Sequence, residues 1–150
     1  MSRNIDYRAL AEFRYQIRRF LNFSERAARA AGLEPQQHQA LLAIKGMPEG
    51  RNGTIGFLAE RLQIRHHSAV ELANRLERRG LLRRVRSQID RREVRVELTP
   101  RGEKILQRLS AANQSELRTL APKLLRALRP AIARAGRPNK ARKKRSTSRR

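Results

Sequence analysis

The 150-residue chain contains no cysteine and no tryptophan, and only 4% of its residues are aromatic. Without cysteine it has no disulfide, no thiolate ligand for a metal ion and no thiol that could sense oxidants. The shortage of aromatic rings argues against single-stranded nucleic acid and RNA as partners, because proteins hold such bases by stacking.

The patterns of membrane proteins and enzymes are also missing. No apolar run is long enough to span a bilayer and the N-terminus has no signal-peptide core, so we expect a cytoplasmic protein. There is no glycine-rich phosphate loop and no nucleophile elbow. On a helix His66 and His67 would point about 100° apart, so they could not bind one metal ion together. The spacing of His67 and Glu71 suits a metal ion, but the sequence offers no third ligand beside them. We therefore expect no enzymatic activity, no metal and no cofactor.

Acidic residues are few: 13, against 36 lysines and arginines, for a net charge of +23. Such an excess predicts a polyanionic partner, and nucleic acid is the first candidate. Eight of the positive residues lie among the last fourteen, 137–150, which contain no acid. We expect this tail to be disordered in isolation. It could serve solubility alone or add contacts with phosphates, and we favour the second because positive segments bind DNA without sequence demands.

Residues 54–79 have the pattern of two helices joined by a tight turn. Thr54 is a good N-cap for the first helix, and Gly80 ends the second. In the second helix, about 66–79, small and branched apolar residues gather on one side and polar or cationic residues on the other. This helix is typical of one that reads DNA, although an ordinary amphipathic helix with a solvated face has the same pattern.

A β-hairpin is predicted directly after these helices. Residues 81–85 and 93–98 are strand candidates, and the second alternates apolar and polar side chains. The seven residues between them are too few for a crossover helix, so the strands must be antiparallel. Thr99 and Pro100 then begin another helix as N-cap and first position. Helix, turn, helix and hairpin in this order predict a winged helix-turn-helix.

At this point the sequence resembles the MarR family of bacterial transcription regulators. The resemblance is carried by Leu58-Ala-Glu-Arg-Leu62, by Arg75-Leu-Glu-Arg-Arg-Gly-Leu81 and by Asp90-Arg-Arg-Glu-Val-Arg-Val-Glu-Leu-Thr99. The family's wing signature, an Asp, an Arg two residues later and a terminal Leu-x-Leu-Thr, is present with Val96 in place of the first Leu. One departure is that Arg65, His66 and His67 stand where the recognition helix usually opens with Ser or Thr.

Two sets of DNA contacts are expected, and the one in the wing is what the resemblance implies. In the major groove we expect the recognition helix to use His67, Ser68, Glu71 and Arg75, and we expect Arg65 and His66, at its start, to reach bases or phosphates. In the wing, Arg92 is expected to enter the minor groove with its guanidinium held by Asp90, while Arg91 contacts the backbone.

Long helices are predicted on both sides of this region. Residues 6–31 carry an apolar stripe, residues 35–45 form a helix packed through Leu41, Leu42 and Ile44, and residues 46–53 are a loop. A helix over 100–113 is followed by another over 114–129, which Pro122 should kink or split, and which Pro130 and Gly136 should end. The resemblance implies that the first and last helices form the dimer interface.

Family members also bind small anionic aromatic ligands between the dimer helices and the DNA-binding lobe. Arg14, Tyr15 and His38 are candidates for such a pocket, although residues in such positions are more often packed in the core or on the surface than in contact with a ligand.

The expected fold class is mainly α with a small β-hairpin wing. Residues 1–136 should form one domain, with a DNA-binding lobe over about 35–100 and dimerisation helices over about 5–31 and 101–134. The expected function is that of a homodimeric regulator that binds a pseudo-palindromic double-stranded operator and is a repressor released by a small ligand. The alternative is a nucleoid-like architectural protein that binds DNA broadly and has no ligand.

Overall fold

The computed structural model describes residues 5–133, which contain five helices and two strands. In chain order they are α1 (Tyr7–Ala30), α2 (Pro35–Lys45), α3 (Ile55–Leu62), α4 (His66–Arg78), β1 (Leu82–Arg86), β2 (Val94–Leu98) and α5 (Pro100–Ile132). The predicted class, mainly helical with one hairpin, is confirmed. The basic stretch 137–150 lies outside the described residues. Within residues 5–133, no helix has the length and apolar character needed to cross a membrane.

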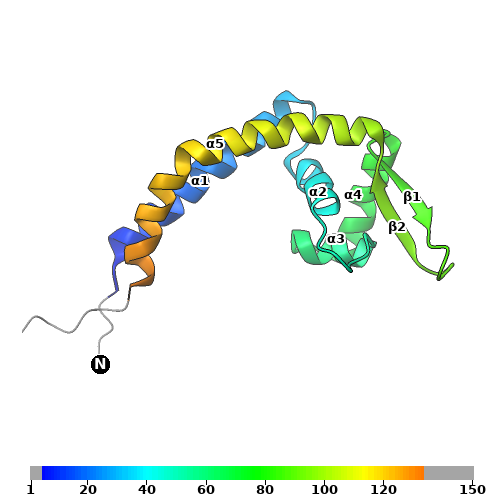
Figure 1. Cartoon of the computed structure of the whole chain (residues 1–150), viewed down its shortest axis with the longest axis horizontal. Helices are drawn as coiled ribbons and strands as arrows, with labels where there is room; N and C mark the ends of the chain where they lie inside the picture. The colour runs from blue at the N-terminus through cyan, green and yellow to red at the C-terminus, as the bar shows by residue number, and fades with distance from the viewer. Residues whose placement is uncertain (1–4, 134–150) are drawn as a thin grey trace, which may run out of the picture.

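The molecule consists of a lobe and a long arm (Figure 1). α1 and α5 lie side by side along the arm, and the beginning of α1 and the end of α5 meet at its far tip. α2, α3, α4 and the hairpin form the lobe at the other end. The core of the lobe contains Leu41 of α2, Leu58 of α3 and Leu76 of α4, all fully buried. The arm therefore extends well away from this core.

The turn between α3 and α4 is built by local backbone chemistry. The hydroxyl of Thr54 accepts a hydrogen bond from the Phe57 N–H at 3.1 Å and so caps the start of α3, as predicted. Gln63 ends the helix in the left-handed conformation, with φ of 54°. Only Ile64 and Arg65 separate it from α4, so the two helices form a compact pair.

The hairpin has the predicted antiparallel pairing, with Leu82 opposite Leu98 and Arg86 opposite Val94. A third segment adds to its edge, because the Val96 N–H donates to the Gly53 carbonyl at 2.7 Å. Leu82 and Val96 are buried against the lobe. The position of the wing is thus fixed by the same core that holds α3 and α4.

The start of α5 is attached to the lobe through Thr99 and Gly102. The Thr99 hydroxyl accepts from the Gly102 N–H at 3.1 Å and donates to the Gly80 carbonyl at 2.6 Å. Gly102 is buried, and a Cβ atom there would overlap the carbonyl oxygen of Leu81. The glycine is needed because the helix passes directly over the backbone that precedes β1.

We expect Gly102→Ala to lower the free energy of unfolding by about 1–3 kcal/mol, the usual range for overpacking. Gly56→Ala is the matched control, because a Cβ there meets only the Thr54 hydroxyl oxygen, at an ordinary 3.7 Å. In the helix α3 this control should be neutral or stabilising by up to about 1 kcal/mol. Urea unfolding of both variants measures the difference, and equal stabilities would show that the backbone at Gly102 has room to move.

Two predictions about the helices are wrong. The segments 100–113 and 114–129 are one 33-residue helix, which contains both Pro122 and Pro130 and arches along its length (Figure 1). Each proline removes one backbone hydrogen bond, but Leu120 and Ala127 are buried on this helix and hold it against α1. A bend is therefore compatible with the structure and a split is not, and α5 continues past Pro130.

The second error concerns α2, whose range is as predicted. Leu42 was expected to pack inward with Leu41 and Ile44, but it is 43% exposed. His38 and Ala40 are buried instead. Leu42 lies at the mouth of a cavity between the lobe and the arm, beside Leu21 and Leu117.

Candidate nucleic-acid interface

The outward face of α4 carries most of the predicted major-groove residues. Ala69, Leu72, Ala73 and Leu76 are buried against the lobe. Arg65, His66, His67 and Glu71 are exposed, and Ser68 is half-buried. The sequence therefore identified the buried and exposed sides of this helix correctly.

The first turn of α4 differs from a capped helix. Arg65 occupies the N-cap in an extended conformation and makes no side-chain cap hydrogen bond. Within residues 5–133 no other side chain pairs with the first N–H groups of the helix, which therefore point outward beside Arg65, His66 and His67. Such an N-terminus, with cationic side chains around it, is suited to a phosphate group.

Arg75 is exposed and lies on the same face of α4 as the other predicted contacts, about 20° around the helix from Ser68 and about 40° from Glu71. It borders a cleft that also contains Glu25 and Glu34, from α1 and the turn before α2. At roughly 100° per residue, it is displaced by about 80° around the helix from His67. Arg78 is exposed and lies within about 20° of His67 on the same count. Arg78 is not among the predicted contacts, although its spacing of seven residues from Glu71 could have identified it.

One arginine of the hairpin ties α4 to the wing. Arg84 of β1 donates to the Glu77 carboxylate at 3.1 Å and to the Asn74 side-chain oxygen at 2.6 Å. These bonds occupy the flank of α4 that faces β1. They fix the wing relative to the recognition helix, so that Asn74 and Glu77 have a structural role.

The loop of the wing, residues 87–93, is ordered by hydrogen bonds to its own backbone. The buried Ser87 hydroxyl accepts from the N–H groups of Ile89 and Asp90, both at 3.3 Å. The Asp90 carboxylate accepts from the Arg92 N–H at 2.9 Å, and the Asp90 carbonyl from the Glu93 N–H at 3.0 Å. The loop thus has a shape set largely by its own hydrogen bonds.

These contacts correct the predicted role of Asp90. Its carboxylate was expected to hold the Arg92 guanidinium, but in the described part of the chain no ion pair joins the two side chains. Asp90 is two residues before Arg92 in a turn, where the nearer partner is the backbone N–H. Both Arg91 and Arg92 are exposed, as a minor-groove contact requires.

The three candidates for a ligand pocket are not brought together. His38 is 2% exposed and borders a cavity of about 400 Å³ between α1, α2 and α5. Asn113 lies in the same cavity, and neither His38 Nε2 nor Asn113 Oδ1 has a partner among the described residues. Arg14 and Tyr15 are exposed on α1 and do not border this cavity. The apolar pattern along a helix does not show on which side of its axis a second helix will pack. For this reason Arg14 and Tyr15 were wrongly grouped with His38.

We expect the stability of the protein to depend on the titration of His38. Burial lowers the pKa of His38 from its usual 6.5. The unfolded chain therefore binds a proton more readily than the folded one, and the free energy of unfolding should fall as the pH drops below about 6.5. His38→Gln should lack this component, which urea titrations between about pH 7.5 and about pH 5.5 would measure. Identical pH dependence in both proteins would mean that His38 is protonated equally in the two states.

Known proteins resemble this chain in both sequence and structure. A family model described as "MarR family" matches residues 31–93. An HTH-type transcriptional regulator of Bacillus subtilis, YsmB, is 34% identical over 67 residues, which are 45% of this chain and 46% of that protein. The chain thus matches about half the length of this relative.

Two solved structures have the same overall fold. A MarR family transcription regulator superimposes with a TM-score of 0.66 at 25% identity, covering 77% of this chain and 75% of that one. The MepR–DNA complex of S. aureus gives a TM-score of 0.60 at 20% identity, covering 75% of this chain and 82% of that one.

Proposed function

We propose that the chain is a winged helix-turn-helix regulator of the MarR type, which binds double-stranded DNA and regulates transcription; its similarity to MarR family proteins in sequence and fold supports this. The observation that carries the proposal is the rigid connection of two cationic elements. Arg84 fixes β1 to α4, and the Ser87 and Asp90 hydrogen bonds fix the loop that presents Arg91 and Arg92. Because α4 and the wing are held at a fixed distance from each other, α4 can enter the major groove of a duplex while the wing enters the neighbouring minor groove.

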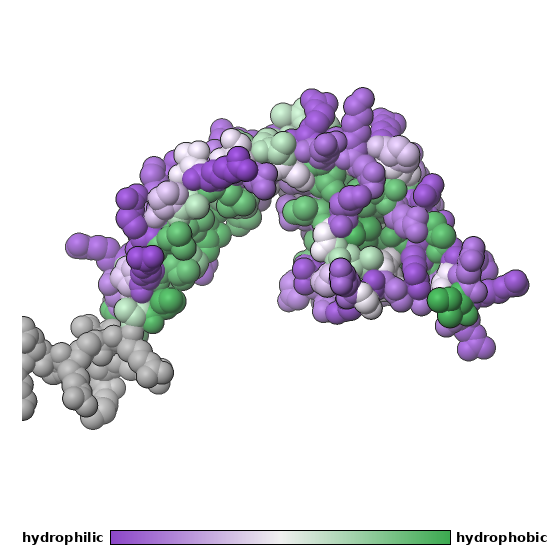
Figure 2. All heavy atoms as spheres, in the orientation of Figure 1, coloured by the Kyte–Doolittle hydropathy of each residue, from purple (hydrophilic) through white to green (hydrophobic). Residues whose placement is uncertain are grey.

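We further propose that the arm forms a homodimer. The described residues leave large apolar side chains exposed along α1 and α5: Leu10, Leu21, Leu117, Leu125 and Ile132. Figure 2 shows apolar surface along the inner side of the arm, between its tip and the lobe. A second copy packed there would remove this surface from water and place two α4 helices on one duplex. The operator should then be pseudo-palindromic.

The cavity beside His38 is the proposed ligand site of the regulator. It lies where α2 of the lobe meets both helices of the arm. A ligand that pairs with His38 and Asn113 would change the angle between lobe and arm, and hence the distance between the two recognition helices. This arrangement suggests that the protein is a repressor, which a small anionic aromatic molecule releases from DNA.

Selection of duplexes from a random pool tests the proposal. We expect enrichment of a sequence with two inverted half-sites whose centres lie about 10 base pairs, or a multiple of that, apart. Failure to enrich any sequence, with strong binding to the whole pool, would favour the architectural alternative.

A further inference from the structure

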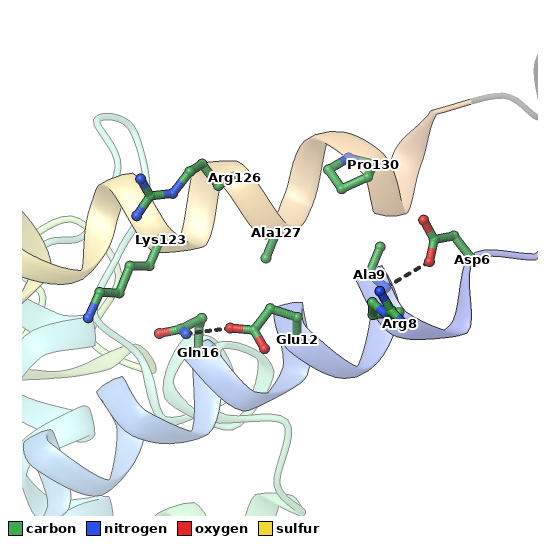
Figure 3. Close-up of a pocket in the computed structure, with 9 residues that line it drawn as sticks. All are labelled: Asp6, Arg8, Ala9, Glu12, Gln16, Lys123, Arg126, Ala127 and Pro130. Atoms are coloured by element: carbon green, nitrogen blue, oxygen red, sulfur yellow. Dashed lines mark hydrogen bonds between the residues drawn. The ribbon is translucent and has the colours of Figure 1, made fainter.

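A second cavity lies in the arm, far from both the lobe and His38. It measures about 520 Å³ and separates the first turns of α1 from the last turns of α5 (Figure 3). Its walls include Ala9, Ala127 and Pro130, and no aromatic ring borders it. The space is therefore lined by short aliphatic groups, with polar side chains around them.

Gln16 is the buried polar group of this cavity. It is only 4% exposed, and its Nε2 donates to the Glu12 carboxylate at 2.7 Å. Its Oε1 has no hydrogen-bond partner among the described residues. Figure 3 shows this oxygen pointing away from Glu12, toward the side where Lys123 lies. A buried acceptor without a partner is costly, so a ligand that donates a hydrogen bond would bind favourably here.

The charges around the cavity favour an anion. Arg8, Lys123 and Arg126 border it, and in the part of the chain described here no carboxylate lies within ion-pair distance of them. The two acidic groups nearby already have partners. Asp6 accepts from the Ala9 N–H at 2.9 Å, and Glu12 accepts from Gln16. These hydrogen bonds come from neutral donors and leave both carboxylates charged, but three cationic side chains against two carboxylates still give the lining a net charge of +1.

The cavity is on the opposite side of the arm from the proposed dimer face. At roughly 100° per residue, Arg126 lies about 180° around α5 from Leu117, and Lys123 about 120° from it. The exposed leucines thus face one side of the α1–α5 contact and the cavity opens on the other. A second copy on the apolar face would leave the cavity accessible.

We propose that this cavity binds a short aliphatic carboxylate that also carries a hydroxyl group. The carboxylate pairs with Lys123 and Arg126, and the hydroxyl donates to Gln16 Oε1. The methylene chain lies against Ala9, Ala127 and Pro130. The ligand would brace α1 against α5, and its binding does not require that the protein bind DNA.

The test uses 6-hydroxyhexanoate and the full-length protein with labelled alanine methyl groups. Titration should shift the NMR signals of Ala9 and Ala127 and leave those of Ala69 and Ala73, in the lobe, unchanged. Hexanoate, which has no hydroxyl, and 1,6-hexanediol, which has no charge, should each bind at least about threefold more weakly. Unmoved Ala9 and Ala127 signals, or equal binding of all three compounds, would overturn the proposal.

Variants separate a ligand site from a packing defect. Gln16→Leu should bind 6-hydroxyhexanoate no better than hexanoate, while its melting temperature should equal or exceed that of the wild type because the unpaired acceptor is gone. Arg126→Gln, at an exposed position, should weaken 6-hydroxyhexanoate by about tenfold, whereas Arg108→Gln on the same helix should have no effect. Wild-type binding by both Gln16→Leu and Arg126→Gln would show that the probe binds elsewhere.

Discussion

Arg92→Ala is expected to weaken binding to the selected operator by about 1–3 kcal/mol for each wing, with no change in melting temperature. Arg92 is exposed on a loop whose shape depends on backbone hydrogen bonds, so its side chain contributes little to folding. Its guanidinium is free to enter a narrow minor groove, where the negative potential is enhanced over A·T-rich steps. Fluorescence anisotropy with the operator, at fixed salt, measures the loss.

Two variants at Asp90 test how the wing is held. Asp90→Ala removes the acceptor of the Arg92 N–H and should weaken operator binding, although it also removes a negative charge near DNA. Asp90→Asn removes the same charge but keeps a side-chain oxygen, so it should bind at least as tightly as the wild type. If Asp90→Ala also binds more tightly than the wild type, charge alone matters and the hydrogen bond does not position the wing.

Leu125→Asp is expected to convert the protein into a monomer and to weaken operator binding by roughly 10²- to 10⁴-fold, the range by which linked sites exceed single ones. Leu125 is 53% exposed in the single chain and lies on the apolar face of α5. A carboxylate there cannot be buried against a second copy without a large desolvation cost. Light scattering at micromolar concentration measures the oligomeric state.

Thr119→Asp is the matched control, because Thr119 is exposed on the other side of α5 and bonds only to the Ser115 carbonyl, at 3.4 Å. It should remain dimeric and bind the operator as the wild type does. A dimeric Leu125→Asp protein, or a monomeric wild type, would contradict the proposed interface.

Local patterns predicted the lobe well because each of its elements is determined by nearby residues. Thr54, Gly80 and the alternation of residues 93–98 set the limits of α3, α4 and the hairpin, and all three occur as predicted. The order of these elements was sufficient to recognise the winged fold. The DNA-contacting roles of their side chains remain predictions.

The arm was less predictable because its packing depends on which helix faces which. The apolar stripe of α1 includes Phe13, Ile17 and Phe20, but these are only half-buried, whereas Gln16 and Ser24 are buried in the single chain. In the sequence a buried glutamine is indistinguishable from an exposed one. For the same reason neither the cavity beside Gln16 nor the separation of Arg14 and Tyr15 from His38 could be predicted from the sequence.

Proline is likewise ambiguous without tertiary contacts. Pro122 and Pro130 are helix breakers by propensity, yet burial of Leu120 and Ala127 keeps α5 continuous around them.

The ratio of affinities for the selected operator and for a scrambled duplex of equal length and composition tests the central claim most directly. Measured with the full-length protein at about 150 mM salt, the ratio should be about 10³ or more, as for proteins that read base edges. A ratio near one, with strong binding to both duplexes, would mean that the protein's net charge of +23 accounts for its binding and that α4 and the wing do not read sequence.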